Sequence, residues 1–138
     1  MAAIWAENSY CKRRQVGALL VKDKMIISDG FNGTPAGFEN VCEDETNRTK
    51  PYVLHAEANA IINADREKMI GSSLYLACVG QEGQIISGTD SCMMCKRMVI
   101  NAGISEVFVR DTATEFRRID VMDWIMNDDS LSVRESGY

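Results

Sequence analysis

A histidine and two cysteines stand at spacings that suit metal chemistry. The histidine opens His55-Ala-Glu57, and the cysteines form Cys92-Met-Met-Cys95. Zinc prefers nitrogen and sulfur ligands in tetrahedral geometry, and a catalytic site supplies three of them and leaves one position to water. His55 is the single histidine of the chain, so a mixed site must use it. The sequence therefore predicts one catalytic Zn²⁺ held by His55, Cys92 and Cys95.

Glu57 follows His55 by two residues, at the expected start of a helix, and can lie beside the metal without binding it. Zinc lowers the pKa of its bound water toward about 7, and a nearby carboxylate can then carry the proton. Glu57 is thus the predicted catalytic residue. Each motif has an ordinary alternative: a CxxC pair is often half of a structural zinc site or a redox pair, and a single histidine is usually a surface or core residue.

The whole chain has the composition of a globular protein. Its 138 residues are 46% hydrophobic and 25% charged, which fits one domain over residues 1–138. The apolar stretches are a few residues long, whereas a membrane span needs about 20. The opening residues lack the basic start of a secretory signal. We therefore expect a cytoplasmic protein that has no membrane partner.

Charge and cysteine content narrow the partners further. The formal net charge is −5, while proteins that grip a polynucleotide usually carry a basic excess. This weighs against DNA or tRNA and leaves room for a small nucleotide. The five cysteines, without an export signal, argue against a disulfide framework.

The spacing of apolar residues and turn formers predicts alternating strands and helices. We expect a three-layer α/β (αβα) sandwich around a central mixed sheet. The expected elements are a helix over 3–13, a hairpin of strands 16–21 and 25–31, a loop over 32–51, a helix over 55–69, a strand over 74–79, a small hairpin excursion over 81–86, a helix over 92–102, strands over 106–109 and 115–121, a short helix through 124–126 and a frayed tail over 130–138.

The stretch His55-Ala-Glu-Ala-Asn-Ala-Ile, followed by Cys-x-x-Cys, resembles the zinc-dependent cytidine and deoxycytidylate deaminase superfamily. Residues 11–18, 30–37 and 95–103 are similar to its deoxycytidylate (dCMP) deaminase branch. The resemblance implies the cytidine deaminase-like fold and hydrolysis of dCMP to dUMP and ammonia, which supplies thymidylate synthesis. In this chemistry water attacks the amino-bearing ring carbon, and the glutamate carries protons to the ring nitrogen and the leaving ammonia. It also implies a homo-oligomer and, as in some relatives, Mg²⁺ with a nucleotide effector.

Four residues are candidates for binding the rest of the substrate. The resemblance implies that Asn32 bonds the sugar 3′-hydroxyl, although an Asn before Gly33 is also a common turn former. Arg13, Arg14 and Arg110 are candidates for the phosphate, with Arg13 and Arg110 preferred, because a guanidinium makes bidentate contacts with phosphate. Each arginine could equally be a solvated surface residue.

The remaining cysteines leave one question open. In some relatives, cysteines at positions similar to Cys11 and Cys42 join further ligands around a second, structural zinc. This chain offers no spare histidine there, so two buried thiols are the default prediction and a second zinc the alternative. Cys78 lies within an expected strand and is predicted to belong to the core.

Three features depart from the family pattern. Ser91 replaces the usual proline before the first zinc cysteine, and we expect it to cap the following helix. The segment 79–90 is longer than a simple loop. The connection before strand 115–121 is too short for a parallel crossover, so the last pair is expected to be antiparallel, as in the free-nucleoside branch.

These departures keep other functions open. The alternatives to dCMP deamination are deamination of cytidine or dCTP, deamination of adenosine in tRNA, and a non-catalytic zinc module. A structural zinc usually has four protein ligands, so the three-ligand count with Glu57 argues against the last alternative.

Overall fold

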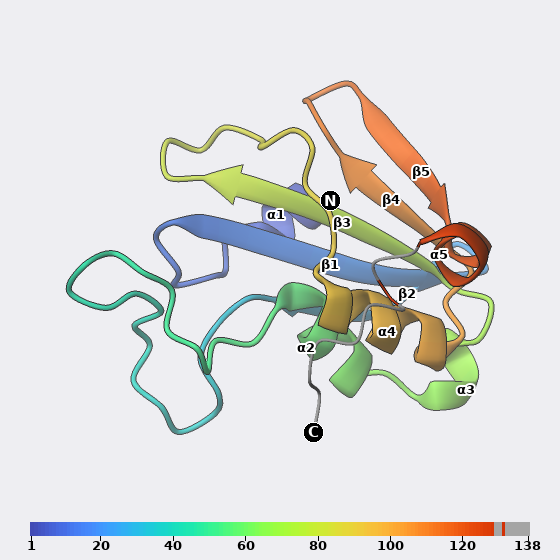
Figure 1. Ribbon diagram of the computed structural model, residues 1–138, viewed down its shortest axis with the longest axis horizontal. Helices are drawn as coiled ribbons and strands as arrows, with labels where there is room; N and C mark the ends of the chain where they lie inside the picture. Colours follow the sequence, from blue (N-terminus) through green and yellow to red (C-terminus); the bar gives the residue numbers. More distant parts are fainter. Residues whose placement is uncertain (129–130, 132–138) are drawn as a thin grey trace.

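The computed structural model describes residues 1–128 and Leu131, and the predicted frayed tail 130–138 otherwise lies outside the described residues (Figure 1). In chain order the elements are α1 (Ala2–Ala6), β1 (Arg14–Lys22), β2 (Met25–Phe31), α2 (Ala56–Ile62), α3 (Arg66–Met69), β3 (Ser73–Gly80), α4 (Met93–Ala102), β4 (Glu106–Arg110), β5 (Phe116–Asp120) and α5 (Val121–Asn127).

The five strands form one mixed sheet in the order β2-β1-β3-β4-β5. Strand β1 runs antiparallel to β2 and to β3, while β3 and β4 are parallel. Helix α4 provides the crossover that a parallel pair requires. Strands β4 and β5 are antiparallel, as the short connection between them predicts.

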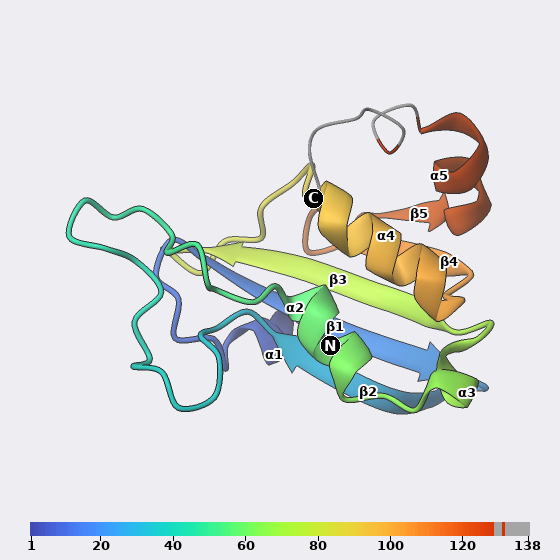
Figure 2. The ribbon, with the colours of Figure 1, turned by 60° about the horizontal axis from the view of Figure 1, so that its bottom comes forward.

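Helices cover both faces of this sheet, which confirms the predicted three-layer sandwich. Helix α1 packs on β1 and β3 from one side, and α2 packs on β1 and β2 from the other. Helices α2 and α4 contact each other and form one layer, as Figure 2 shows. None of the described helices has the length and apolar character needed to cross a membrane.

Two glycines let helices approach the sheet closely. A side chain at Gly17 would collide with the backbone of Ala2 and Ala6 in α1. A side chain at Gly30 would collide with the backbone of Ala56 and Ala60 in α2. Glycine is the residue that permits such close approach. The second contact matters for the site, because it sets the height of α2 above the sheet next to His55.

The main core lies between the sheet and the layer formed by α2 and α4. Apolar side chains from β1, β3 and β4 alternate toward this layer, as expected for strands with one buried face. Its most completely buried large members are Leu20, Leu74, Leu76, Val99, Val107 and Val109. This packing joins α2 and α4 to the same three strands, so the starts of the two helices are held in a fixed relation.

Two predicted helices differ from the structure. Helix α1 ends at Ala6 instead of residue 13, because the Ser9 hydroxyl donates to the Asn32 carbonyl and accepts from the Cys11 amide, which leads the chain away from the helix axis. The predicted helix 55–69 is divided into α2 and α3. Asp65 is extended at the N-cap of α3, and aspartate favours such cap positions over helix interiors.

Other local predictions are confirmed. The β1–β2 hairpin turns through Asp23 and Lys24, both with positive φ, and Gly103 ends α4 in the left-handed region. The excursion after β3 folds back on itself, since Ile85 bridges to Val79.

Candidate metal centre and active site

The starts of two helices bring the predicted metal ligands together. His55 is the N-cap of α2 and Cys92 is the N-cap of α4, and both have extended backbone. Cys95 lies in the first turn of α4. The Leu54 strand bridge to Gly33 fixes the chain immediately before His55. Because α2 and α4 pack side by side, their N-termini present all three side chains to one point.

The distances within this group fit a zinc ion. His55 Nδ1 lies 3.4 Å from Cys92 Sγ and 3.4 Å from Cys95 Sγ, and the three ligand atoms lie within 4.8 Å of one another. Typical zinc–nitrogen and zinc–sulfur bonds at a tetrahedral angle place nitrogen and sulfur about 3.6 Å apart. Among the residues that the structure describes, His55, Cys92 and Cys95 are the one group of three or more potential metal ligands whose atoms lie this close together.

The surroundings of the thiols favour a bound cation. Burial raises the pKa of the Cys95 thiol, and the neighbouring Glu57 and Cys92 raise it further. The Cys92 sulfur accepts a hydrogen bond from the Cys95 amide at 3.4 Å. A thiolate placed here needs a positive charge beside it, and a metal ion that displaces the thiol proton supplies that charge.

Glu57 lies in the first turn of α2 and is 4% exposed. Its carboxylate interacts with the Cys95 side chain and shares a cavity with His55 and Cys92. The structure thus brings the predicted base beside the three predicted ligands. A buried carboxylate at this place can accept a proton from a metal-bound water and pass it on.

The cavity has a volume of about 350 Å³, within the range of small-ligand sites. Its lining comes from the start of β1, from β3, from the starts of α2 and α4, and from the loops 32–54 and 81–91. The lining residues are Cys11, Arg13, Arg14, Val16, Asn32, Glu43, Thr49, Val53, His55, Ala56, Glu57, Leu76, Cys78, Thr89, Asp90 and Cys92.

The candidate arginines lie in different places. Arg13 and Arg14 line the cavity of the metal ligands. Arg110 lines a second cavity, of about 450 Å³, next to the stacked rings of Tyr75 and Phe108. The structure of this chain therefore does not bring Arg110 to the metal ligands, although it ends β4 as predicted.

Asn32 lines the cavity, but its side chain bonds to the sheet. Its Oδ1 accepts from the Val16 amide at 2.8 Å, and its Nδ2 donates to the Arg14 carbonyl at 2.9 Å. These bonds hold the start of β1 beside the residues that follow β2. A contact with the sugar stays a prediction.

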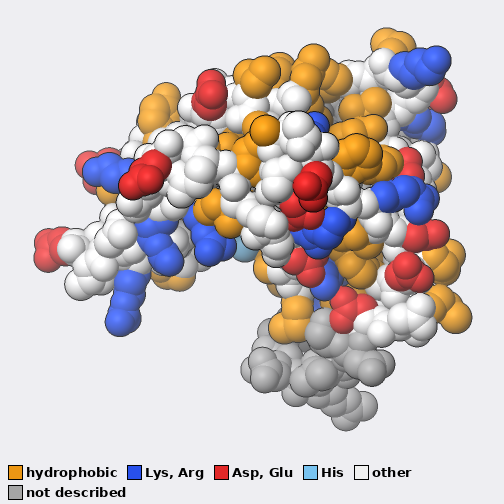
Figure 3. All heavy atoms as spheres, turned by 90° about the horizontal axis from the view of Figure 1, so that it is seen from above, with side chains coloured by type: hydrophobic (Ala, Val, Ile, Leu, Met, Phe, Trp, Pro, Cys, Tyr) orange, Lys and Arg blue, Asp and Glu red, His pale blue; other side chains and the backbone are white. Residues whose placement is uncertain are grey.

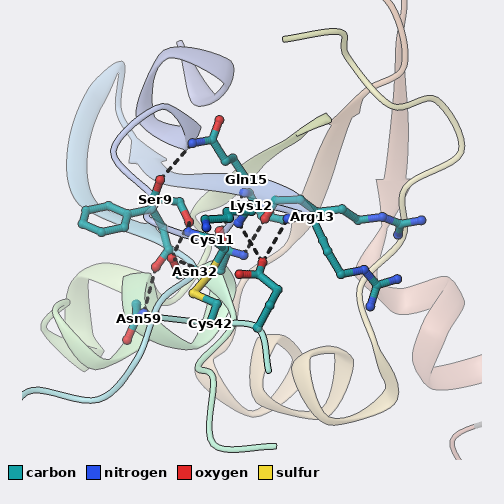
Figure 4. The surroundings of a disulfide bond; sticks show 12 residues. Ser9, Cys11, Lys12, Arg13, Gln15, Asn32, Cys42 and Asn59 are labelled. Atoms are coloured by element: carbon teal, nitrogen blue, oxygen red, sulfur yellow. Dashed lines mark hydrogen bonds between the residues drawn. A yellow bond between two sulfur atoms is a disulfide. The ribbon is translucent and has the colours of Figure 1, made fainter. Parts of the chain in front are cut away.

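Cys11 and Cys42 form a disulfide, which corrects the predictions of two free thiols and of a second zinc (Figure 4). The cysteine content of a sequence indicates the redox compartment, but it does not show which cysteines lie close together. Loop 32–54 returns to β1 and places the two Cα atoms 5.1 Å apart. Cys78 is free and buried, as predicted.

Glu43, beside this disulfide, is a residue that the sequence argument missed. It is buried, and its Oε1 accepts from the amides of Lys12 and Arg13 at 2.7 and 2.9 Å. Its position beside Cys42 in an acidic loop gives no sign of this contact, which joins residues about thirty positions apart.

The start of α4 corrects another prediction. Cys92, and not Ser91, is the N-cap residue. Ser91 is buried, and its amide donates to the Asp90 carboxylate at 2.9 Å. The helix start therefore uses the metal ligand itself as its cap, which couples the placement of the thiol to the placement of the helix.

Comparisons with known proteins agree with this geometry. Residues 1–110 match the model of the "Cytidine and deoxycytidylate deaminase zinc-binding region" family. The chain is 31% identical over 121 residues to the deoxycytidylate deaminase of Mycobacterium phage D29, covering 78% of this chain and 86% of that protein. It is 32% identical to the deoxycytidylate deaminase of Saccharomyces cerevisiae, of which it spans 34%.

A solved structure shows the same relation. The dCMP deaminase of cyanophage S-TIM5, in complex with dCMP and dUMP, superposes with a TM-score of 0.65 at 35% identity, covering 96% of this chain and 87% of that chain. A matched family region over most of the chain, relatives above 30% identity and the three convergent zinc ligands all agree. The chain belongs to the cytidine and deoxycytidylate deaminase family and carries its zinc-binding region.

Proposed function

We propose that this chain hydrolyses dCMP to dUMP and ammonia with one zinc ion. The observation that carries the proposal is the convergence of His55, Cys92 and Cys95 beside Glu57, which lines one cavity together with Arg13. The S-TIM5 relative, whose structure contains dCMP and dUMP, supports the choice of substrate.

The chain's own residues divide the chemistry. When bound, zinc supplies a water molecule of lowered pKa in its open position. Glu57 would act as the general acid and base, and would move protons to the ring nitrogen and the leaving amino group. Its burial keeps bulk water from competing for these protons. His55, Cys92 and Cys95 would hold the ion beside Glu57.

The outer part of the cavity suits a nucleotide. Arg13 and Arg14 are the positive side chains among its lining residues, and a guanidinium is well matched to a phosphate. We propose Arg13 as the main phosphate contact, with Asn32 close to the sugar. Arg110 lies outside this cavity in the described chain, so a role for it in phosphate binding has no support from the geometry of one chain.

Other properties stay predictions. The single domain over 1–138 and a cytoplasmic location are expected from the sequence, and a homo-oligomer and Mg²⁺ with a nucleotide effector are implied by the family resemblance. On the face that Figure 3 shows, basic side chains gather beside the histidine, and elsewhere basic and acidic side chains are mixed. The net charge of −5 supports a small nucleotide over a polynucleotide as substrate.

The test is ammonia release by the zinc-loaded protein from dCMP, CMP, dCTP, deoxycytidine and cytidine. We expect dCMP to have the highest kcat/KM. Equal turnover of deoxycytidine would remove the phosphate from the proposal, and no release from any of the five would contradict deamination itself.

A further inference from the structure

The segment from Gln81 to Ser91 connects β3 to the zinc ligand Cys92. Thr89 and Asp90, near its end, line the active-site cavity. The backbone path of this segment therefore determines the shape of one cavity wall. It is the same stretch that is longer than a simple strand-to-helix loop.

Two side chains from the β4–β5 hairpin hold this segment. Asp111 Oδ1 accepts a hydrogen bond from the Gly88 amide at 2.9 Å, and Arg117 Nη2 donates one to the Thr89 carbonyl. The two side chains also pair with each other, Arg117 Nε to Asp111 Oδ2 at 2.7 Å. The Asp111 side chain is 14% exposed and the Arg117 side chain 40%, so the pair is partly buried.

The acceptor and the donor of the pair each face a backbone group of the opposite kind. An acceptor faces the N–H of Gly88, and a donor faces the C=O of Thr89. The antiparallel pairing of β4 and β5 brings the two side chains together. Arg117 in β5 stands opposite Val109 in β4, and Asp111 follows Val109 by two residues.

We propose that Asp111 and Arg117 are positioning residues for the deamination site. They fix the backbone at Gly88 and Thr89, and thereby the cavity wall that Thr89 and Asp90 form against the substrate. The inference rests on the proposed dCMP deamination. It predicts an effect on substrate binding larger than the effect on the chemical step, because Glu57 and the metal ligands keep their own contacts.

The experiment compares Asp111→Ala and Arg117→Ala with Arg118→Ala. Arg118 is the matched control, because it is also on β5 and also pairs with a carboxylate, that of Glu106 at 2.7 Å, but this bond goes to β4 and not to residues 81–91. Three quantities are measured on each zinc-loaded protein: KM and kcat for dCMP, zinc per chain, and hydrogen exchange of peptides covering residues 81–91.

Asp111→Ala and Arg117→Ala should each raise KM about tenfold, the size of effect expected for a charge-assisted hydrogen bond. They should speed exchange within residues 86–91 and leave one zinc per chain with kcat little changed. Asp111→Asn, which keeps an acceptor for Gly88, should lie between the wild type and Asp111→Ala. Arg118→Ala should match the wild type in all three quantities.

The exchanged pair Asp111→Arg with Arg117→Asp separates positioning from simple ion pairing. It keeps opposite charges but sets a donor against the Gly88 amide and an acceptor against the Thr89 carbonyl, so KM should stay raised. Restoration of KM by this double variant, or unchanged KM and exchange in both alanine variants, would overturn the inference. If the wild type does not deaminate dCMP, the proposed function fails, while the exchange measurement still decides whether the pair holds the segment.

Discussion

The active-site cavity is built in two different ways. The metal end, formed by His55, Glu57, Cys92 and Cys95, rests on the starts of two helices whose packing on the sheet fixes them. The loop wall, formed by loops 32–54 and 81–91, rests on separate long-range contacts: the disulfide, the Glu43 hydrogen bonds and the Asp111–Arg117 pair. The packing of the core therefore positions the catalytic residues, whereas the shape of the substrate site depends on a few separate loop contacts.

Replacing Glu57 should have the largest effect, since it removes proton transfer at the metal end. We expect Glu57→Gln to lower kcat for dCMP by about 10²- to 10⁴-fold, the usual contribution of a general acid or base. Zinc content, measured by atomic absorption, should stay at the wild-type value.

Glu43→Gln is the matched control, because Glu43 is also a buried acid of the cavity but bonds to the amides of Lys12 and Arg13. It should alter stability more than kcat. An equal loss of kcat in both variants would remove the distinction between the two regions.

Breaking the disulfide should act on stability. Cys42→Ser opens a link between cysteines 31 positions apart and should lower the free energy of unfolding by about 2–4 kcal/mol. Urea unfolding measures the loss, and treating the wild type with a phosphine reductant should reproduce it. If reduction leaves the wild-type midpoint unchanged, the disulfide does not support the loop wall.

Removing the phosphate contact should change substrate preference. Arg13→Ala should raise KM for dCMP about 10- to 100-fold, as for a lost hydrogen bond between charged groups, with KM for deoxycytidine unchanged. Arg110→Ala is the control, since Arg110 lines the other cavity. An effect of Arg110→Ala as large as that of Arg13→Ala would show that the cavity of one chain is not the complete substrate site.

The smallest effect concerns pH. Hydrogen bonds from Arg117 and then from the Gly88 amide lower the pKa of Asp111 below its ordinary value. A lowered folded-state pKa gives stability that is present above the unfolded pKa, about 3.9, and is lost as pH falls through the folded value. The difference in Tm between the wild type and Asp111→Asn should therefore be constant near neutrality and shrink below about pH 4. A difference at pH 2 as large as that at pH 7 would contradict the ionised pair.

The contrast between the two regions also explains what could be predicted from sequence. His55, Glu57, Cys92 and Cys95 lie in short motifs whose spacing alone suits a zinc site. The sheet, the αβα layers and the antiparallel last pair follow from hydrophobic pattern and connection length.

The loop wall could not be predicted in this way. The partners of Cys42 and Glu43 are about thirty residues distant, and Arg117 meets Thr89 across 28 positions. Such contacts depend on how the loops fold back onto the sheet, and a local sequence pattern does not predict this. The break between α2 and α3 was missed for a simpler reason, because the apolar spacing continues through Asp65 although that residue favours a cap.

The central claim is that the metal end carries zinc-dependent deamination of dCMP. The most direct test removes zinc with a chelator, measures ammonia release from dCMP, and repeats the measurement after one equivalent of zinc is added back. We predict that release is lost with the metal and returns with one zinc per chain. Undiminished release by the metal-free protein, or none after zinc is restored to a folded chain, would contradict the account.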